Sequence, residues 1–447
     1  MAGKKTQAQL TPEEKLQQAL VPTAEQPYKV PANWCWTYLK NVSDCLDNFR
    51  KPINANERNA RLGDVPYYGA TGQVGWIDDY LTNEELVLLG EDGAPFLDLL
   101  KNKAYLINGK AWVNNHAHIL RSKFGTMGNR LLIEYLNSFD FTGFVTGTTR
   151  LKLTQASMNK IIIPLVPLAE QQRIVERIES LFAKLDEAKE NMQNVLEGFE
   201  TRKAAILHKA FTGELTAKWR KQHGVSMDTW ESVKVSNLCE NIVCGKTPTS
   251  YIDNNGDIPY LKVYNIVNNK IDFDSKPQYI PKKIHESKLK SSILKPKDVI
   301  MNIVGPPLRK IAIIPDTYSE WNMNQAIVRF RTKEKLYYKY LYYYLIYPKT
   351  LDDIICETKG VVGQANISIT QSRNLNINLP TFSEQTEIVR IIDELFVKEQ
   401  QAKELAENAL SKVDLIKKTI LARAFRGELG TNNPADEAAV ELLKRVL

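Results

Sequence analysis

Two long polar stretches of the chain carry an apolar or small residue at alternating steps of four and three. In the first stretch these residues are Ile174, Ile178, Leu181, Leu185, Ala188, Met192, Val195 and Phe199. The equivalent positions of the second stretch hold Ile388, Ile392, Leu395, Glu399, Ala402, Ala406, Ala409 and Val413. Such steps are typical of helices that wind around one another. The pattern therefore predicts two spacer helices, over 167–215 and 381–429, that pair antiparallel as a coiled coil.

The length of these helices predicts a mechanical role. A stripe of about 40 residues corresponds to a rod of about 60 Å, at 1.5 Å per residue. The alternative is that each helix packs only on its own domain, but such a helix would rarely keep one apolar stripe over this length. We therefore expect the paired helices to hold two other parts of the chain at a set separation.

The two stretches are copies of one sequence. Residues 168–215 align with 382–429 without a gap, and 21 of the 48 aligned positions are identical. The similarity continues upstream, where GTTRLKLTQ matches GQANISITQ, and Trp34 at the entry to the first half is echoed by Trp230. The repeating unit is therefore half of the protein rather than a short motif.

Short apolar runs such as IIIPL, DVIMNIV and KIAIIP, separated by turns rich in Gly, Pro and Asn, precede each long helix. They predict strands within two mixed α/β globular domains, and an α+β fold overall. The C-terminal segment and the N-terminal extension would together supply the link from AFRGEL to Trp34 that TAKWRKQHGVSMDT supplies from AFTGEL to Trp230. The two halves would thus be arranged as a ring that is cut at one point. The expected organisation is an N-terminal extension (1–27), a first globular domain (28–166), a central spacer helix (167–215), a second globular domain (216–380), a distal spacer helix (381–429) and a C-terminal helix (430–447).

Composition narrows the class of protein. The chain has 59 Lys and Arg against 52 Asp and Glu, and a net charge of +7 permits nucleic-acid binding without requiring it. Five cysteines form no CxxC, which fits a reducing compartment and argues against structural zinc. No apolar run reaches the roughly 18 residues of a membrane span, and none follows the lysines of MAGKKTQAQL as in a signal peptide. We expect a cytoplasmic protein that does not contact membranes.

The sequence offers no convincing catalytic or metal site. GKT at 245–247 resembles the end of a phosphate-binding loop, but Glu240 stands where its first glycine should be. Asp274, Glu286 and Lys288 have the loose spacing of a nuclease, which arises by chance in a Lys-rich chain. His116 and His118 alternate as on a strand, yet no third ligand stands nearby in the sequence. The chain also lacks the [DN]PP[FY] tetrapeptide of an amino-methyltransferase. We predict no catalytic residue and no bound metal.

The repeated opening EQ-x2-IV-x2-I-x2-LF, the GEL ending, the Trp entry and the circular two-half layout resemble the specificity subunit of type I restriction-modification enzymes. The resemblance covers nearly the whole chain. It implies that each globular domain is a target recognition domain, and that the helices set the spacing of a bipartite double-stranded DNA target.

The same resemblance implies a set of partners. The chain would not be an enzyme itself and would bind two methyltransferase subunits, with restriction subunits joining in the full complex. S-adenosylmethionine, ATP and Mg²⁺ would belong to those partners, and this chain would bind no cofactor.

Reading DNA requires cations for phosphates, and amides, hydroxyls or guanidinium groups on loops for base edges. In the first domain the stretches YYGATGQVGW, WVNNHAH and GTTR supply Thr71, Gln73, Asn114, Asn115, His116, Thr149 and Arg150. In the second domain, candidates for phosphate or guanine contacts are Lys246, Lys262, Arg309 and Lys310. Candidates for reading base edges there are Thr247, Tyr264, Asn265, Gln325 and Gln364.

Each of these interpretations has a structural alternative. The pair Asn114 and Asn115 is also typical of a hairpin turn. The lysines between 276 and 297 fit a solvated face as well as a DNA-facing one. The aromatic segment 335–347 could stack bases, but its first-domain counterpart LLIEYL predicts an ordinary packing helix. For the whole chain, the alternative function is a coiled-coil scaffold with two protein-binding heads and no sequence-specific DNA reading.

Overall fold

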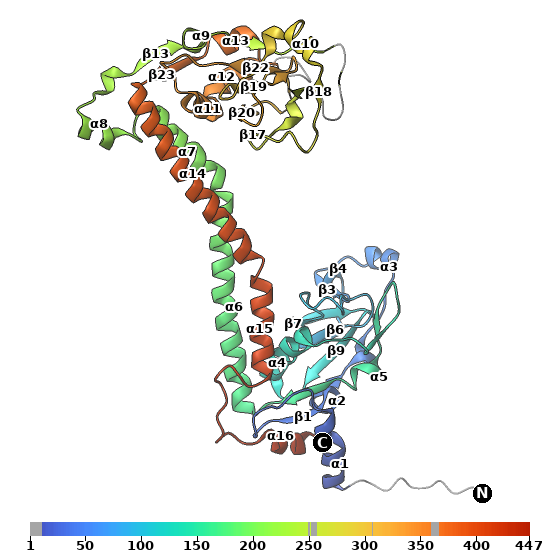
Figure 1. Ribbon diagram of the computed structural model, residues 1–447. Coiled ribbons are helices and arrows are strands. Elements are labelled where there is room, and N and C mark those ends of the chain that lie inside the picture. The colour runs from blue at the N-terminus through green and yellow to red at the C-terminus, as the bar shows by residue number, and fades with distance from the viewer. Residues whose placement is uncertain (1–10, 249–250, 252–256, 306, 359–365) are drawn as a thin grey trace. The chain divides into compact units, whose positions relative to one another are not determined.

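A computed structural model describes residues 11–248, 251, 257–305, 307–358 and 366–447. The chain forms two compact units (Figure 1). Unit 1 comprises Met1–Met192 and Asn408–Leu447, and unit 2 comprises Gln193–Glu407. Each unit therefore contains one globular head and one end of each long helical segment. Among the described residues, no helix is both long enough and apolar enough to span a lipid bilayer.

The head of unit 1 contains two four-stranded sheets. The first has the order β2 (Ser43–Cys45), β9 (Ala117–Ser122), β6 (Leu86–Gly90) and β7 (Ala104–Ile107), all antiparallel. The second has the order β4 (Gln73–Ile77), β3 (Val65–Tyr68), β8 (Lys110–Val113) and β5 (Thr82–Asn83). Within it β3 and β8 are parallel. Strand β1 (Cys35–Tyr38) pairs antiparallel with β12 (Ile162–Leu165) and joins the beginning of the head to its end.

The sequence of β6 shows why its sheet lies in the centre of the head. All five residues of LVLLG are buried. Val87 and Leu89 belong to the larger core, together with helix α4 (Gly125–Ser138), whereas Leu86 and Leu88 belong to a second core with β8 and β9. Because side chains alternate along a strand, a continuous apolar run is needed when both faces of the sheet are covered.

The head of unit 2 repeats this topology, although the two heads share little sequence. Its four-stranded sheet has the order β14 (Val243–Cys244), β22 (Ile327–Phe330), β19 (Val299–Asn302) and β20 (Ile311–Ile313). A second sheet has the order β18 (Tyr279–Ile280), β15 (Ile258–Leu261) and β21 (Asn322–Met323), with β15 and β21 parallel. Strands β13 (Glu231–Lys234) and β23 (Asn376–Leu379) pair as β1 and β12 do. The predicted strands in DVIMNIV and KIAIIP are confirmed as β19 and β20.

The aromatic segment 335–347 forms a packing helix, as predicted. Helix α11 (Tyr338–Ile346) buries Tyr340 and Tyr343 in the core of the second head. The hydroxyl of Tyr340 donates to the carbonyl of Asn378, 2.8 Å away. With their rings enclosed, these two tyrosines cannot stack on a nucleic-acid base.

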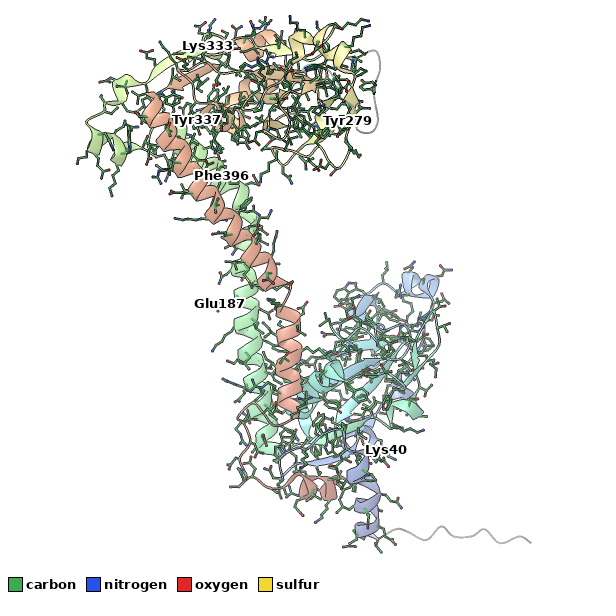
Figure 2. The ribbon with its side chains drawn as sticks, in the orientation of Figure 1. Lys40, Glu187, Tyr279, Lys333, Tyr337 and Phe396 are labelled. Atoms are coloured by element: carbon green, nitrogen blue, oxygen red, sulfur yellow. The ribbon has the colours of Figure 1, made fainter. Side chains whose placement is uncertain are left out.

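The long helical segments pair antiparallel within each unit (Figure 1). In unit 1, α6 (Leu168–Glu197) lies beside α15 (Val413–Phe425), and the Lys417 ammonium pairs with Asp186 at 2.6 Å. In unit 2, α7 (Phe199–Phe211) lies beside α14 (Phe382–Leu410), and Arg202 pairs with Glu399 at 2.8 Å. The Lys203 ammonium also lies 5.2 Å from the ring centre of Phe396, which Figure 2 labels on α14.

The expectation of two unbroken helices needs correction. Each segment is interrupted at the same place of the repeat, at Gly198 in the first copy and at Ser411 and Lys412 in the second. Glycine is a poor helix former, and the Arg202 guanidinium donates to the carbonyl of Val195 at 2.8 Å next to it. The Lys412 amide donates to Ala409 at 3.0 Å, which is the tighter pattern of a 3₁₀ turn.

Burial along the predicted seam is also less uniform than the stripe suggests. Ile174, Ile178, Phe199, Ile388, Ile392 and Ala406 are buried. Leu181, Leu185, Met192 and Leu395 are half-buried, and Val195, Ala402 and Ala409 are exposed. Most of the buried positions of α6 and α14 lie in their first turns, where the helices belong to the cores of the heads. Away from the heads, a two-stranded seam covers only one side of each helix, and less apolar surface is removed from water.

The EQ motif at the beginning of each long helix holds the surrounding segments together. In unit 1, Glu170 is fully buried and accepts hydrogen bonds from the indole of Trp34 at 2.7 Å, the Thr431 hydroxyl at 3.1 Å and the Asn432 amide at 2.8 Å. The neighbouring Gln171 donates to the carbonyl of Val166 at 3.0 Å. The carboxylate thus ties the entry strand, the helix and the C-terminal segment to one point, and a position in the first helical turn favours its negative charge.

The second copy makes the equivalent arrangement. Glu384 is fully buried and accepts from the indole of Trp230 at 3.0 Å and from the Thr216 hydroxyl at 2.7 Å. The Arg220 guanidinium completes the group at 2.5 Å from the same carboxylate. We call Glu170 and Glu384 the anchor carboxylates. They explain why Trp and EQ recur together in the repeat, and each of them also binds the segment that follows GEL.

The two ends of the chain meet in unit 1, as the circular layout predicted. Helix α16 (Ala439–Val446) packs against α1 (Pro12–Ala19) and strand β12, and its Leu442 and Leu443 are buried in the larger core of that unit. The Asn33 side chain donates to the carbonyl of Asn433 at 3.0 Å. In unit 2 the continuous segment through helix α8 (Ala217–His223) occupies the same place in the repeat.

A half-buried carboxyl on α4 makes the stability of unit 1 depend on pH. Burial, together with the nearby Glu179 carboxylate, raises the pKa of Glu134 to about 7, although Lys417 opposes the shift. The folded state therefore binds this proton more tightly than the unfolded chain does. Stability is lost as the pH rises from about 4.5 to 7, and the cost is complete above that range.

We therefore expect Glu134→Gln to stabilise unit 1 at pH 8 by on the order of 3 kcal/mol and to have little effect at pH 4.5, because the amide resembles the protonated acid. Urea unfolding of both proteins at the two pH values measures the difference. An equal effect at both pH values would show that ionisation of Glu134 is not the cause.

Candidate nucleic-acid interface

Most of the predicted DNA-binding residues that the structure describes lie at one edge of each head. In the first head, the parallel strands β3 and β8 end at Tyr68 and Val113, and the loops that follow contain 69–72 and 114–116. The two loops are joined by a hydrogen bond from the amide of Asn114 to the carbonyl of Tyr68, 3.1 Å long. Because the carboxyl ends of parallel strands meet at the same edge of a sheet, segments 45 residues apart become neighbours.

The second head has the same edge. Its parallel strands β15 and β21 end at Leu261 and Met323, and the amide of Asn324 donates to the carbonyl of Leu261 at 2.9 Å. This bond is the counterpart of the one between Asn114 and Tyr68. The loops at 262–265 and 324–326 therefore correspond to 69–72 and 114–116 of the first head. We call each of these two loop pairs, together with the segments packed on them, a reading edge.

Most candidates on the reading edge of the first head are exposed, but Asn114 is not. Thr71 lies in the turn between β3 and β4, and Gln73 begins β4 and donates to the carbonyl of Gly75 at 3.1 Å. Asn115 is exposed. The Asn114 side chain is 8 % exposed and accepts from the amide of His116 at 2.8 Å. Asn114 stabilises the turn, so the expectation that its amide faces DNA is corrected.

A charged group lies beside these loops. Arg150 follows the exposed Thr149, and its Nε lies 2.7 Å from Oδ1 of Asp92. The second oxygen of Asp92 is 3.4 Å from Nδ1 of His116, and a terminal nitrogen of Arg150 is 3.4 Å from the same ring nitrogen. The backbone amides of Glu91 and Asp92 both donate to the carbonyl of His116. The structure thus brings His116 and Arg150 together around an acidic residue that the sequence analysis did not identify.

The reading edge of the second head carries different side chains. Lys246 and Thr247 are exposed, and the Thr247 hydroxyl donates to the Gln325 amide oxygen at 2.6 Å. The carbonyl of Lys246 accepts from the hydroxyl of Tyr260 at 2.8 Å, which fixes the loop on β15. The sequence predicted Lys246, Thr247 and Gln325 separately, and the structure places all three at one edge.

The loop after β15 contains a half-buried candidate, Lys262, an exposed one, Tyr264, and a buried one, Asn265. The Lys262 ammonium lies 4.7 Å from the ring centre of Tyr251, and Tyr264 is 41 % exposed. Asn265 is fully buried: its side chain accepts from the amide of Lys262 at 2.9 Å and donates to the carbonyl of Asp272 at 3.2 Å. Asn265 therefore stabilises the loop, and its prediction as a base reader is corrected.

Two further candidates have internal partners. Arg309 adopts a positive φ of 71°, pairs with Asp352 and donates to the carbonyl of Pro348 at 3.1 Å. These contacts are made to helix α12 (Pro348–Thr358) rather than toward the reading edge, which corrects the prediction of Arg309 as a contact to phosphate or guanine. Lys310 is half-buried, and its ammonium donates to the carbonyl of Val263 at 3.4 Å. Gln364 lies outside the residues that the structure describes.

Sequence reasoning missed Tyr251 and Asp92 near the reading edges, and it named Lys276 only within a run of lysines that fits a solvated face equally well. Tyr251 and Lys276 flank the loop after β15, the first beside Lys262 and the second 5.9 Å from the ring of Tyr264. Asp92 was missed because an acidic residue is an unusual neighbour for DNA. A signal was available, since Asp92 and Gly93 form a short polar break after the apolar run of β6.

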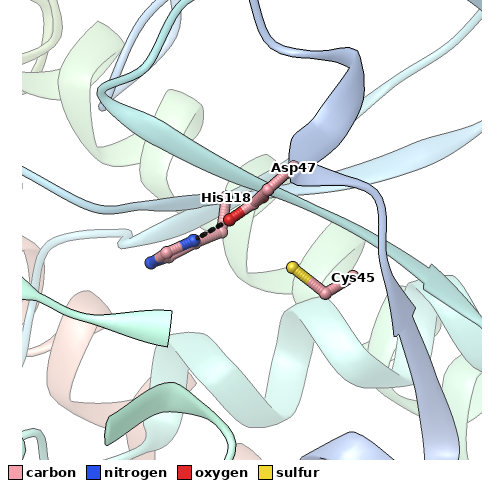
Figure 3. Close-up of side chains that lie close together, drawn as sticks. All are labelled: Cys45, Asp47 and His118. Atoms are coloured by element: carbon pink, nitrogen blue, oxygen red, sulfur yellow. Dashed lines mark hydrogen bonds and ion pairs between the residues drawn. The ribbon is translucent and has the colours of Figure 1, made fainter. Parts of the chain in front are cut away.

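One group of side chains has the donor types of a metal site. Ligand-type atoms of Cys45, Asp47 and His118 lie within 4.8 Å of one another (Figure 3). The group does not include His116, and Asp47 lies 71 residues from His118 in the sequence, so the local spacing of the histidines did not indicate it. Both ring nitrogens of His118 already have partners, Asp47 at 2.6 Å and the carbonyl of Leu153 at 2.9 Å.

The charges of this group are already balanced. Burial opposes the ionisation of Asp47, but the bond from His118, helped by the Ile119 amide and Arg50, lowers the pKa of Asp47 overall. Burial also raises the pKa of the Cys45 thiol, which disfavours the thiolate that a metal would bind. We therefore interpret the group as a hydrogen-bonded lock that holds Asp47 to β9.

Comparisons with known proteins agree with this architecture. Residues 32–197 and 227–407 each match a family described as the type I restriction modification DNA specificity domain. A putative type I restriction enzyme specificity subunit of Haemophilus influenzae is 28% identical over 370 residues, which are 80% of this chain and 86% of that protein. The EcoBI specificity subunit of Escherichia coli is 25% identical over 314 residues, 66% of this chain and 65% of that protein.

Solved structures share the fold. The HsdS subunit of Thermoanaerobacter tengcongensis superposes with a TM-score of 0.62 at 18% identity, covering 91% of this chain and all of that one. A chain from a study of complex assembly and conformational transition in the type I R-M system superposes with a TM-score of 0.58 at 17% identity, covering 90% of this chain and 100% of that one.

Proposed function

The chain belongs to the type I restriction-modification DNA specificity family, and we propose that its two heads read the two separate parts of one bipartite DNA target. As a specificity subunit it recognises DNA and leaves the chemistry to other subunits. Residues 28–166 and 216–380 serve as the target recognition domains in this proposal. The rods over 167–215 and 381–429 set the distance between them.

One observation carries this proposal. The central four-stranded sheets of the two heads have the same strand order, and both heads have a reading edge at a parallel strand pair, yet the edges present different chemistry. The first has a charged group of Asp92, His116 and Arg150, whereas the second has Lys246 and the neutral pair of Thr247 and Gln325. Equivalent positions with unlike hydrogen-bonding groups are what two unlike half-sites require. A scaffold with two protein-binding heads would not need polar side chains gathered at these loops.

The proposal includes the partners of the family. Two methyltransferase subunits bind the helical rods, and restriction subunits join them in the full complex. In this proposal S-adenosylmethionine, ATP and Mg²⁺ are bound by those subunits and not by this chain. The complex works in the cytoplasm, where it meets DNA.

Expression with the cognate methyltransferase subunit in a host that lacks other DNA methylation tests the function. Sequencing of the modified bases should then give one motif with two specific parts and a fixed unspecified gap. A control without this chain should give none. Methylation of a single continuous motif, or methylation independent of this chain, would contradict the proposal.

The proposal predicts how salt affects the second reading edge. Lys246→Ala should weaken DNA binding by the assembled complex for every sequence, and it should reduce the slope of log K against log salt by about 0.9, the value for one lost phosphate contact. Lys333→Ala is the matched control, because Lys333 follows β22 at the end opposite Gln325 (Figure 2). Fluorescence anisotropy across a salt series measures both slopes, and equal slopes in the two variants would contradict the contact.

A further inference from the structure

The group at the first reading edge holds Arg150 in a specific orientation. Its Nε is engaged by Oδ1 of Asp92 at 2.7 Å, and its side chain remains 58 % exposed. One terminal nitrogen also lies 3.4 Å from His116. The guanidinium is planar, so a partner at Nε fixes the direction in which the two terminal amino groups point.

We propose that Asp92 is a positioning residue that directs Arg150 to a guanine in the half-site read by the first head. The inference rests on the proposed function and names one base that the first head recognises. Two terminal amino groups in one plane match the O6 and N7 acceptors of guanine in the major groove, which is the commonest specific contact of arginine with DNA.

The charge balance favours a base over a phosphate as the ligand. Asp92 is 25 % exposed and lies within hydrogen-bond distance of the guanidinium, so the pair has little net charge to attract a phosphate. A carboxylate this close would repel a phosphate group but not the neutral edge of a base. The arrangement therefore lowers the affinity of Arg150 for DNA of any sequence and fixes the orientation of its guanidinium. Both properties suit a residue that reads sequence.

The backbone around Asp92 keeps the arginine in this place. Gly93 has a φ of 80°, and a Cβ there would come within 3.1 Å of the Arg150 Nε. The Gly93 amide donates to the carbonyl of Leu151 at 2.9 Å, and the backbone of Asp92 forms an isolated antiparallel β-bridge with that of Lys152. The loop carrying Asp92 is thus bonded directly to the segment carrying Arg150, and these backbone contacts keep the two residues next to each other.

The experiment uses the full chain in complex with its methyltransferase subunit. Competition binding uses the target sequence that the complex methylates. It compares this duplex with duplexes in which one guanine at a time, in either half, is replaced by 7-deazaguanine, which lacks the N7 acceptor. We expect one guanine in one half to be discriminated by roughly 5- to 150-fold in the native complex.

In Arg150→Ala and Arg150→Lys this discrimination should fall below about threefold, because alanine makes no contact and lysine is a point charge. Asp92→Ala should also lose it, and should gain affinity for unrelated DNA because the repelling carboxylate is gone. Discrimination in the other half should stay unchanged in all three variants. Arg121→Ala is the matched control, since Arg121 also pairs with acidic residues but lies at the far end of β9.

Two outcomes would overturn the inference while the proposed function stands. One is an unchanged response to every 7-deazaguanine in Arg150→Ala. The other is an equal loss of affinity for all sequences, which indicates a phosphate contact. Arg150 is exposed, so its variants test the idea even if Asp92→Ala fails to fold. A native complex without a bipartite methylation motif would instead refute the proposed function, and the inference with it.

Discussion

Glu384→Gln is expected to lower the free energy of unfolding of unit 2 by about 3 to 5 kcal/mol, because it leaves a buried cation without its counter-charge. The Arg220 guanidinium is 8 % exposed and lies 2.5 Å from this carboxylate, whose own side chain is fully buried. The amide oxygen could still accept hydrogen bonds, but the amide nitrogen would place an N–H donor against Arg220, Thr216 or Trp230, all of which donate. A loss of this size is a large fraction of the stability of a typical domain.

Glu170→Gln is the matched control from the other copy of the repeat. Glu170 accepts from Trp34, Thr431 and Asn432, which are neutral donors. Its loss should therefore cost only about 1 to 3 kcal/mol, the range for buried hydrogen-bonding groups without partners. Chemical unfolding followed by tryptophan fluorescence compares the two variants. Equal losses would show that the ion pair with Arg220 does not contribute to the free energy of unfolding. The absence of any loss would show that the anchor carboxylates do not stabilise the fold.

The anchor carboxylates illustrate how far the sequence could be interpreted. The alignment of 168–215 with 382–429 identified EQ as a repeated element, and Trp34 and Trp230 as equivalent entries. It did not show that these features are in contact, because 136 residues separate Trp34 from Glu170. A repeat shows which residues are equivalent in the two halves. The contact between a tryptophan and a glutamate within one half depends on how the head folds back onto the helix.

The reading edges show a second limit. Asn114 and Asn265 have the same composition cues as the exposed Asn115 and Tyr264, namely a polar residue in a loop near glycine or aromatic residues. Their side chains hydrogen-bond the backbone of their own loops and are buried. Asparagine is favoured both for reading base edges and for stabilising turns, so residue type alone cannot separate the two roles.

The shared topology of the heads could not be predicted, for a related reason. The strands β2, β9, β6 and β7 and their counterparts β14, β22, β19 and β20 have the same order but unlike sequences. A buried strand needs apolar residues of suitable shape rather than a particular sequence, so its pairing partners leave little trace in the chain. The helical repeat is easier to detect because its apolar period persists over many turns.

Lengthening both rods is expected to change the DNA target itself. Seven residues inserted after Met192 in α6 and seven after Glu407 in α14 add about 10 Å to each helix and preserve the phase of the apolar stripe. We expect the unspecified gap in the target to grow by about three base pairs, at 3.4 Å per base pair. Methylation at the original spacing should fall at least 100-fold, because only one head can then reach its half-site and each lost base pair costs about 1 to 3 kcal/mol.

An insertion of seven residues in α6 alone is the control, because it puts the paired helices out of register and should abolish assembly rather than give a new gap. The methylation motif of each variant, obtained by co-expression with the methyltransferase subunit, distinguishes the outcomes. A doubly lengthened protein that keeps the original gap would mean that the methyltransferase subunits, and not the rods, set the distance between half-sites. Retention of both half-site sequences with a longer gap would show that the rods measure distance independently of what the heads read.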